Sequence, residues 1–192
     1  MPVNLVILAA GQGTRMQSDR PKVLHEVAHA PLLHHAMGAA AALEPERTVV
    51  VVGHGAEAVE AAAQDFDPAA QVVLQAEQLG TGHAVAQARA ALEGAAGETI
   101  VLYGDTPFIR PETLEAMVAA RAQHDVVVLG FEAADPGRYG RLVMTGDRLE
   151  RIVEFKDASA EERAITLCNS GVICAGTELL SALVAEIGCD NA

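Results

Sequence analysis

The chain has 192 residues, of which 51% are hydrophobic and only 3% are aromatic. This composition excludes a disordered chain and favours a sheet covered by helices over a sandwich with large aromatic plugs. With 13 basic and 26 acidic residues, the net charge is −13, which argues against a general nucleic-acid-binding protein because neutralising many phosphates needs a basic surface. A small phosphate compound can still bind where a few cations gather, and the chain has only two lysines, Lys22 and Lys156.

The cysteines and the N-terminal sequence predict the cellular compartment and its redox state. Cys168, Cys174 and Cys189 are odd in number and lack CxxC spacing, which argues against a disulfide framework or a zinc site. We expect Cys168 and Cys174 to be small core residues. The apolar run 3–10 is too short to span a membrane, and no signal-peptide pattern is present. The sequence therefore predicts a reduced, cytoplasmic protein that binds neither membrane nor nucleic acid.

Strands and helices alternate along the first 130 residues. The first expected strand, 3–8, is a continuous apolar run that ends at glycines, as is typical of a buried parallel strand. The alternation predicts a mostly parallel α/β sheet with right-handed crossovers. The further expected strands are 48–52, 71–74, 99–103 and 125–130, and the expected helices are 31–43, 56–64, 82–92 and 111–123.

After residue 130 the alternation changes. Thr145-Gly146-Asp147 is typical of a hairpin turn between two strands, and Ser159 with Glu162 is typical of a capping box at the start of a short helix. Since no repeat or low-complexity linker is present, we expect a single domain over 1–192. The elements expected in this part are strands 141–144, 148–155 and 166–175 and helices 159–164 and 178–187.

Polar loops at 11–22, 75–83 and 103–105 follow expected strands of the sheet. Ligands of open α/β sheets bind beyond the carboxyl ends of the strands, so these loops form the candidate site. Two histidines nearby have ordinary structural explanations. We expect His54 to be a turn residue and His83 to support the glycine-containing loop before it.

The first of these loops has the residue types of a phosphate-binding loop. Gly11 and Gly13 let backbone N–H groups approach an anion closely, and Arg15 adds a planar charged fork. The loop is no dinucleotide fingerprint, because Met16 stands where the third glycine would be. It is no Walker loop either, because no Gly-Lys-Ser/Thr follows. A different class of nucleotide site is therefore indicated.

Six stretches, in order along the chain, resemble the sugar-phosphate nucleotidyltransferases. Within that superfamily the chain is most similar to the uridylyltransferase domain of the bifunctional N-acetylglucosamine-1-phosphate uridyltransferase/glucosamine-1-phosphate acetyltransferases. The resemblance implies a Rossmann-like three-layer α/β/α fold with a mostly parallel mixed sheet. The stretches are 8–16 with Pro21-Lys22, 74–83, 102–105, Tyr139-Gly140-Arg141, 153–158 and Asn169-Ser170-Gly171.

The resemblance also implies a reaction and a role for each matching residue. The reaction is Mg²⁺-dependent uridylyl transfer from UTP to N-acetylglucosamine 1-phosphate, which gives pyrophosphate and the peptidoglycan precursor UDP-N-acetylglucosamine for cell wall biogenesis. Arg15 would neutralise the departing phosphates, Lys22 would hold the reacting phosphates, and Asp105 would bind Mg²⁺. The residues implied to contact the nucleotide are Leu8, Ala9, Ala10, Gly11, Gln75, Gly80 and Thr81, and those implied at the sugar are Tyr103, Gly104, Gly140, Glu154 and Asn169.

Physical chemistry is consistent with this set. A sugar phosphate is already an anionic nucleophile, so the protein needs no activated Ser or Cys; it must align two anions and offset their repulsion. Lys22, on the phosphate loop, is expected to be functional. Lys156 lies two residues after Glu154, so in a strand both would share a face, and either a ligand contact or an ion pair with Asp157 or Glu154 would explain it.

The sequence also departs from the family pattern. It ends before the position of the Asn that completes the family's Mg²⁺ site, which leaves Asp105 as the protein ligand. Nothing in it resembles the β-helix acetyltransferase domain, so we expect a C-terminally truncated domain that forms no trimer. Two alternatives stay open: a nucleotide-sugar-binding fragment with little or no catalysis, or a related enzyme for another base or sugar.

Overall fold

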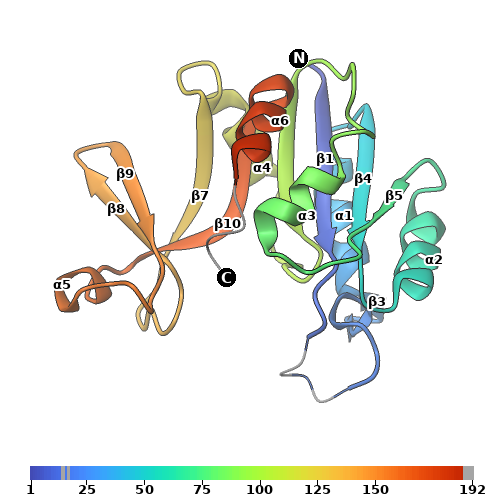
Figure 1. Ribbon diagram of the computed structural model, residues 1–192, viewed down its shortest axis with the longest axis horizontal. Coiled ribbons are helices and arrows are strands. Elements are labelled where there is room, and N and C mark those ends of the chain that lie inside the picture. Colours follow the sequence, from blue (N-terminus) through green and yellow to red (C-terminus); the bar gives the residue numbers. More distant parts are fainter. Residues whose placement is uncertain (14–15, 17, 188–192) are drawn as a thin grey trace. The chain divides into compact units, whose positions relative to one another are not determined.

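The computed structural model describes residues 1–13, 16 and 18–187 (Figure 1). The chain divides into two compact units. The first unit comprises Met1–Val127 and the segment from Cys174 onward, and the second comprises Val128–Ile173. The second unit begins where the alternation of strands and helices ends in the sequence.

The first unit is built on a parallel sheet with β1 (Val3–Ala9) in its middle. β1 pairs in parallel with β4 (Arg47–Val52) on one side and β6 (Glu98–Tyr103) on the other, and β4 pairs in parallel with β5 (Gln71–Leu74). Every residue of β1 is buried. A strand covered on both faces is apolar nearly throughout, and each fully buried Val or Leu contributes about 1.5–3 kcal/mol. This explains why the continuous apolar runs predicted these strands. The polar exception in β1 is Asn4, whose Nδ2 donates to the Ala96 carbonyl at 2.9 Å.

Helices cover both faces of this sheet. α3 and α6 contact each other and lie in front of the sheet in Figure 1, whereas α1, which contacts α2 and α4, lies behind it. The sheet and its two helical layers confirm the predicted Rossmann-like α/β fold. The helices are α1 (Leu32–Ala41), α2 (Ala56–Phe66), α3 (Thr81–Gln87), α4 (Pro111–Ala120) and α6 (Thr177–Glu186).

A short segment between β1 and α1 was not predicted. It contains a single 3-10 turn, η2 (Lys22–Leu24), and a two-residue hairpin of β2 (Glu26–Val27) and β3 (Ala30–Pro31). The hairpin turn holds Ala28 and His29 at φ values of 51° and 66°. Ala is not typical of the left-handed region, and although His is enriched there, no Gly, Asn or Asp stands at the turn, so its sequence signal is weak.

The second unit contains antiparallel pairs. β8 pairs antiparallel with β9 and with β10, and β10 also pairs with β7. The β8–β9 turn places Gly146 at φ 60°, as expected for a hairpin glycine. The elements are β7 (Val126–Glu132), β8 (Arg141–Thr145), β9 (Arg148–Val153), α5 (Ala160–Arg163) and β10 (Leu167–Gly176), of which β7 begins and β10 ends in the first unit.

Two further sequence predictions are confirmed. Ser159 and Glu162 form the predicted capping box at the start of α5. Cys168 and Cys174 are both free and fully buried, whereas Cys189 lies outside the described residues. Across the described part of the chain, no helix combines the length and apolar character that crossing a membrane would need.

Several element ends were predicted wrongly: α1 ends at Ala41 rather than 43 and α4 at Ala120 rather than 123, and α3 and β9 also end early. α3 ends at Gln87 rather than 92. Beyond it the chain continues in turns, in which the amides of Ala88 and Arg89 donate to the carbonyls of Val85 at 3.0 Å and Ala86 at 3.2 Å. Arg47 donates to the carbonyls of Ala91 at 2.8 Å and Glu93 at 3.0 Å in this segment. β9 ends at Val153 rather than 155, because Asp157 donates to the Glu154 carbonyl in a turn.

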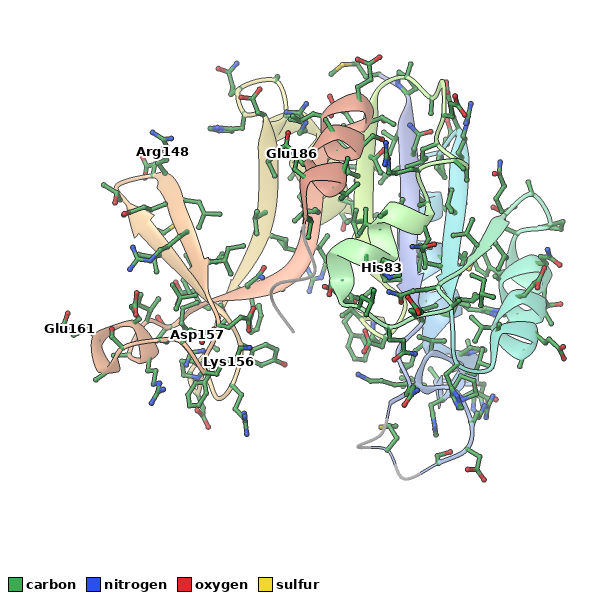
Figure 2. The ribbon with its side chains drawn as sticks, viewed as in Figure 1. His83, Arg148, Lys156, Asp157, Glu161 and Glu186 are labelled. Carbon is green, nitrogen blue, oxygen red and sulfur yellow. The ribbon has the colours of Figure 1, made fainter. Side chains whose placement is uncertain are left out.

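The end of β9 changes the interpretation of Lys156. Because Glu154, Lys156 and Asp157 lie in this turn, Lys156 does not share a strand face with Glu154 (Figure 2). Among the residues that the structure describes, Lys156 forms no ion pair. Of the two explanations left open for Lys156, the ion pair with Asp157 or Glu154 is therefore not formed.

Candidate functional site

A pocket of about 280 Å³ lies in the first unit at the carboxyl ends of the parallel strands. It is formed where the sequence predicted a ligand site, by the loops that follow β1, β5 and β6 and by the start of α3. Its lining is Leu8, Ala9, Ala10, Gly11, Lys22, Val23, Gln75, Gln78, Gly80, Thr81, Ala84, Tyr103 and Asp105.

The loop after β1 is held by backbone contacts at close range. The amide of Gly104 donates to the Leu8 carbonyl at 2.9 Å, so the β6 end extends the pairing with β1. A Cβ on Gly53 would lie 2.8 Å from the Ala10 carbonyl oxygen, so the turn after β4 packs directly on this loop. The floor of the pocket is therefore rigid backbone, which can present N–H and C=O groups to a ligand without rearranging.

The two glycines of the loop differ in what requires them. Gly13 has φ +61°, and a Cβ there would lie 2.7 Å from the Cβ of Lys22. By contrast, a Cβ on Gly11 would meet nothing within 4 Å. Gly13 thus lets the chain pass close to Lys22, whereas Gly11 leaves space above the pocket. Arg15, the third residue predicted to act in this loop, lies outside the described residues.

Lys22 and Asp105 bring opposite charges together at the pocket. The ammonium of Lys22 donates to Oδ2 of Asp105, and their side chains are 36% and 24% exposed. η2 supplies the lysine and the loop after β6 supplies the aspartate. Because both side chains remain accessible, a phosphate can reach the ammonium and a cation can reach the carboxylate.

Hydrogen bonds tie the loop after β5 to the pocket. Gln75 is only 5% exposed, and its Nε2 donates to the Gly80 carbonyl at 3.2 Å. Gln78, farther along the loop, donates from Nε2 to the Ala10 carbonyl at 2.9 Å. Gly80 itself has φ +99° at the N-cap of α3, a conformation that favours glycine. Gln78 therefore links the β5 loop to the β1 loop, whereas Gln75 ties the start of the β5 loop to its end.

The pocket brings together all seven residues predicted for the nucleotide, both described residues predicted as catalytic, and Tyr103 of the sugar set. Gly104 is adjacent rather than lining, and a Cβ there would press on Val23 and Leu33 at 3.2 and 3.3 Å. The prediction missed Val23, Gln78 and Ala84. Gln78 alone had a sequence signal, since it lies in the 74–83 stretch. The predicted residues that line the pocket are Leu8, Ala9, Ala10, Gly11, Lys22, Gln75, Gly80, Thr81, Tyr103 and Asp105.

The second unit gathers three residues predicted at the sugar. The amide of Asn169 donates to the Gly140 carbonyl at 2.9 Å. A Cβ on Gly140 would lie 3.1 Å from Oε1 of Glu154, so only glycine lets that carboxylate approach the backbone without a shift. The side-chain oxygen of Asn169 accepts from the Gly171 amide at 2.9 Å. Backbone and side-chain groups therefore converge around Gly140.

The buried guanidinium of Arg141 supports this cluster, although sequence reasoning gave it no role. Arg141 is 2% exposed and donates to the carbonyl of Tyr139, to that of Gly137 at 3.1 Å and to that of Arg163 at 3.2 Å. Within the described residues its Nε has no partner. Arg141 thus fixes the turn that leads into Gly140 through carbonyls rather than through a carboxylate.

A parallel sheet with helices on both faces and a pocket beyond the carboxyl ends of its strands defines a Rossmann-like α/β domain. The solved structure of a UDP-glucose pyrophosphorylase, complexed with UDP-glucose, shares this fold with a TM-score of 0.77 at 19% identity, covering 96% of this chain and 80% of that one. The chain belongs to the family of MobA-like NTP transferase domains, whose model matches residues 5–183.

Curated relatives extend this similarity over the whole chain. The bifunctional protein GlmU of Cereibacter sphaeroides (strain ATCC 17025) is 70% identical over 190 residues, which is 99% of this chain and 42% of the relative. GlmU of Ruegeria pomeroyi is 68% identical over 192 residues, 100% of this chain and 43% of the relative. The chain therefore spans less than half the length of these relatives.

Proposed function

We propose that the chain transfers a uridylyl group from UTP to N-acetylglucosamine 1-phosphate, producing UDP-N-acetylglucosamine for cell wall synthesis. One observation carries the proposal: Lys22, Asp105 and Gln75 converge in one pocket of a chain 70% identical to a bifunctional protein GlmU. The pocket offers a cation for phosphates, a carboxylate for a metal and an amide for a base.

The proposed chemistry is a displacement at phosphorus. A phosphate oxygen of the sugar phosphate attacks the α-phosphorus of UTP, the bond from that phosphorus to the oxygen bridging to the β-phosphorus breaks, and pyrophosphate leaves. Aligning the two anions can supply roughly 7–11 kcal/mol of the barrier reduction. Lys22 would stabilise the charge on the phosphates, and Arg15 is proposed to neutralise the departing pyrophosphate.

The donors at the pocket fit a divalent cation that shares its ligands with substrate. No cluster of three or more His, Cys, Asp or Glu side chains occurs in the described part of the chain, which leaves the Asp105 carboxylate as the donor proposed here. Mg²⁺ typically takes one or two carboxylates and completes its shell with waters and substrate phosphates. When bound, Mg²⁺ would supply neutralisation of phosphate charge. Asp105 would hold the cation, and Lys22 would then be released from Asp105 to meet phosphate.

The two ends of the nucleotide sugar are proposed to have separate binding groups. Gln75, Gly80 and Thr81, with the backbone of 8–11, would contact the uracil. Tyr103 and Gly104 lie at the end of β6 and would line the edge near the reacting phosphates. Gly140, Glu154 and Asn169 would bind the hydroxyls and the amide of N-acetylglucosamine.

A pyrophosphate-release assay tests the proposal. The 192-residue chain is incubated with UTP, Mg²⁺ and N-acetylglucosamine 1-phosphate, and each component is omitted in turn. We expect release only with all three, and loss of most release in Asp105→Asn. No turnover with measurable calorimetric binding of UDP-N-acetylglucosamine would indicate a binding fragment instead. Faster turnover with TTP, GTP or another sugar phosphate would identify a related enzyme. A chain that shows no binding and no turnover would refute the proposal.

A further inference from the structure

The loop after β5 contains a strap, defined here as residues 76–79, in which every residue is exposed. The chain is anchored at both ends of this strap. Gln75 is buried, and its amide donates to the Val52 carbonyl at 2.8 Å. At the other end, the Gly80 carbonyl accepts the Ala84 amide of α3 at 3.1 Å. The strap is therefore a short exposed segment between two fixed points.

One side chain ties the strap to another part of the chain. Nε2 of Gln78 donates to the Ala10 carbonyl at 2.9 Å, and the opposite orientation of this amide would set two acceptors against each other. The backbone of the strap adds only an internal bond, from the Leu79 amide to the Glu77 carbonyl at 3.1 Å. Among the hydrogen bonds of the described residues, that of Gln78 alone joins 76–79 to a different segment.

The acceptor of this bond is held in place. Ala10 is 5% exposed, and a Cβ on Gly53 would lie 2.8 Å from its carbonyl oxygen, so the turn after β4 packs directly against this peptide. The strap has no such support. A motion that breaks the bond between Gln78 and Ala10 must therefore be a motion of the strap.

The bond also joins two walls of the pocket. Gln78 and Ala10 both line the pocket, the first from the β5 loop and the second from the β1 loop. The base is proposed to lie between these loops, in contact with Gln75 and with the backbone of 8–11. Breaking the bond would widen the space between the loops, and forming it again would narrow that space around a bound base.

A single hydrogen bond makes a latch that opens readily. The net contribution of one neutral hydrogen bond shifts an equilibrium by about two- to tenfold. Opening uncovers no buried residue of the strap, because residues 76–79 are already exposed when the latch is closed. The open strap is therefore a minor state within reach of thermal motion, and a ligand can pass while it is open.

We infer that Gln78 is a positioning residue: it latches the strap onto the β1 loop, and opening of this latch admits and releases the nucleotide. The inference rests on the proposed function, because that function places the base between the two loops. Without the latch, the open state is more populated in the free and in the bound chain alike. Association and dissociation should then both become faster, while their ratio, the Kd, changes little.

This pair of rates separates the latch from other roles of Gln78. Loss of a direct contact with the nucleotide would speed dissociation and leave association unchanged. A general loosening of the loop would weaken binding. If Gln78 instead competed with the base for the Ala10 carbonyl, its removal would tighten binding.

The test compares two variants with the unmodified 192-residue chain by surface plasmon resonance, with UTP and Mg²⁺ as the probe. Gln78→Met keeps the length of the side chain and removes the donor. Gln71→Met is the matched control, because Gln71 is an exposed glutamine of β5 that does not line the pocket.

We expect Gln78→Met to raise both the association and the dissociation rate of UTP by up to roughly tenfold, with Kd within about twofold of the unmodified chain. Gln71→Met should leave both rates unchanged. Unchanged rates in Gln78→Met, a change in one rate alone, or equal changes in the two variants would overturn the latch and leave the proposed function standing. Failure of the unmodified chain to bind UTP would refute the proposed function, and the latch with it.

A second measurement uses the unmodified chain. A glutamate-specific protease can cut after Glu77 only when the strap leaves the protein surface, so its rate reports the open population. Glu93 is the internal reference, since it is exposed in a turn and does not line the pocket. We expect saturating UTP to slow cleavage after Glu77 several-fold relative to cleavage after Glu93. A ratio that UTP leaves unchanged would overturn the inference.

Discussion

Replacing Lys22 by Ala should separate catalysis from stability. Lys22 and Asp105 are 36% and 24% exposed, so their ion pair is screened by water and contributes at most about 1 kcal/mol to stability. The change keeps the Cβ that packs against Gly13, and Asp105 can be hydrated when it loses its partner. Folding should therefore be nearly unaffected.

The same substitution removes a charged donor from the phosphates. A hydrogen bond from a charged group contributes about 1.5–3 kcal/mol, which corresponds to a loss of turnover of roughly 10- to 150-fold. Pyrophosphate release and urea unfolding measure the two effects on one preparation. Arg20→Ala is the matched control, because Arg20 forms an exposed ion pair with Glu26 at 2.9 Å and does not line the pocket. A folded Lys22→Ala chain with turnover within about threefold of the unmodified chain would refute the role of Lys22.

Three further predictions concern groups outside the pocket. Arg141→Met should lower the free energy of unfolding by about 2–5 kcal/mol, since buried carbonyls lose a charged donor, and a urea midpoint equal to that of the unmodified chain would contradict this. The backbone of Ser159, and next Arg151, lower the pKa of Glu162 from 4.5 to about 2. The stabilisation by the ionised carboxylate should thus be complete above about pH 4.5 and vanish towards pH 2. In urea unfolding, the free energy by which Glu162→Gln is less stable than the unmodified chain should therefore shrink as the pH falls over that range, and a difference independent of pH would exclude this cause. Burial, and then the charge of Glu98, raise the pKa of the Cys174 thiol to about 12, so iodoacetamide should leave Cys174 unmodified at pH 8 until the chain unfolds, as peptide mass spectrometry would show.

Much of the first unit follows from its sequence because its central strands β1, β4 and β6 are buried on both faces. The strand β5 has the predicted bounds, and β1, β4 and β6 differ by one residue, since an apolar run ends where the chain must meet water. Positions set by contacts distant in sequence were missed. Residues 88–92 have helical propensity, yet they form turns after α3 ends at Gln87, and Arg47, on another element, donates to the carbonyls of Ala91 and Glu93 there.

In the candidate site, too, positions with a local sequence signal could be predicted, whereas contacts between residues distant in sequence could not. Strand-end loops carry their own signal, so the positions of Lys22, Gln75 and Asp105 could be predicted to lie close together. Their roles stay predictions. Sequence reasoning expected His83 to support its loop, but its contacts with the side chains of Gln75 and Gln87 depend on where the imidazole lies in space. Likewise, nothing in the pattern of residues around Arg141 indicates that its guanidinium is buried among carbonyls.

The position of the two lysines has a practical consequence. Lys22 belongs to the first unit and Lys156 to the second, so an amine-acylating reagent can add one label to each unit, besides the N-terminal amine of Met1. Lys22 is engaged by Asp105, whereas Lys156 forms no ion pair with any described residue. The acylation rate of Lys156 is therefore an internal reference, and protection of Lys22 relative to it would report occupancy of the pocket in a single mass spectrum, without changing the chain.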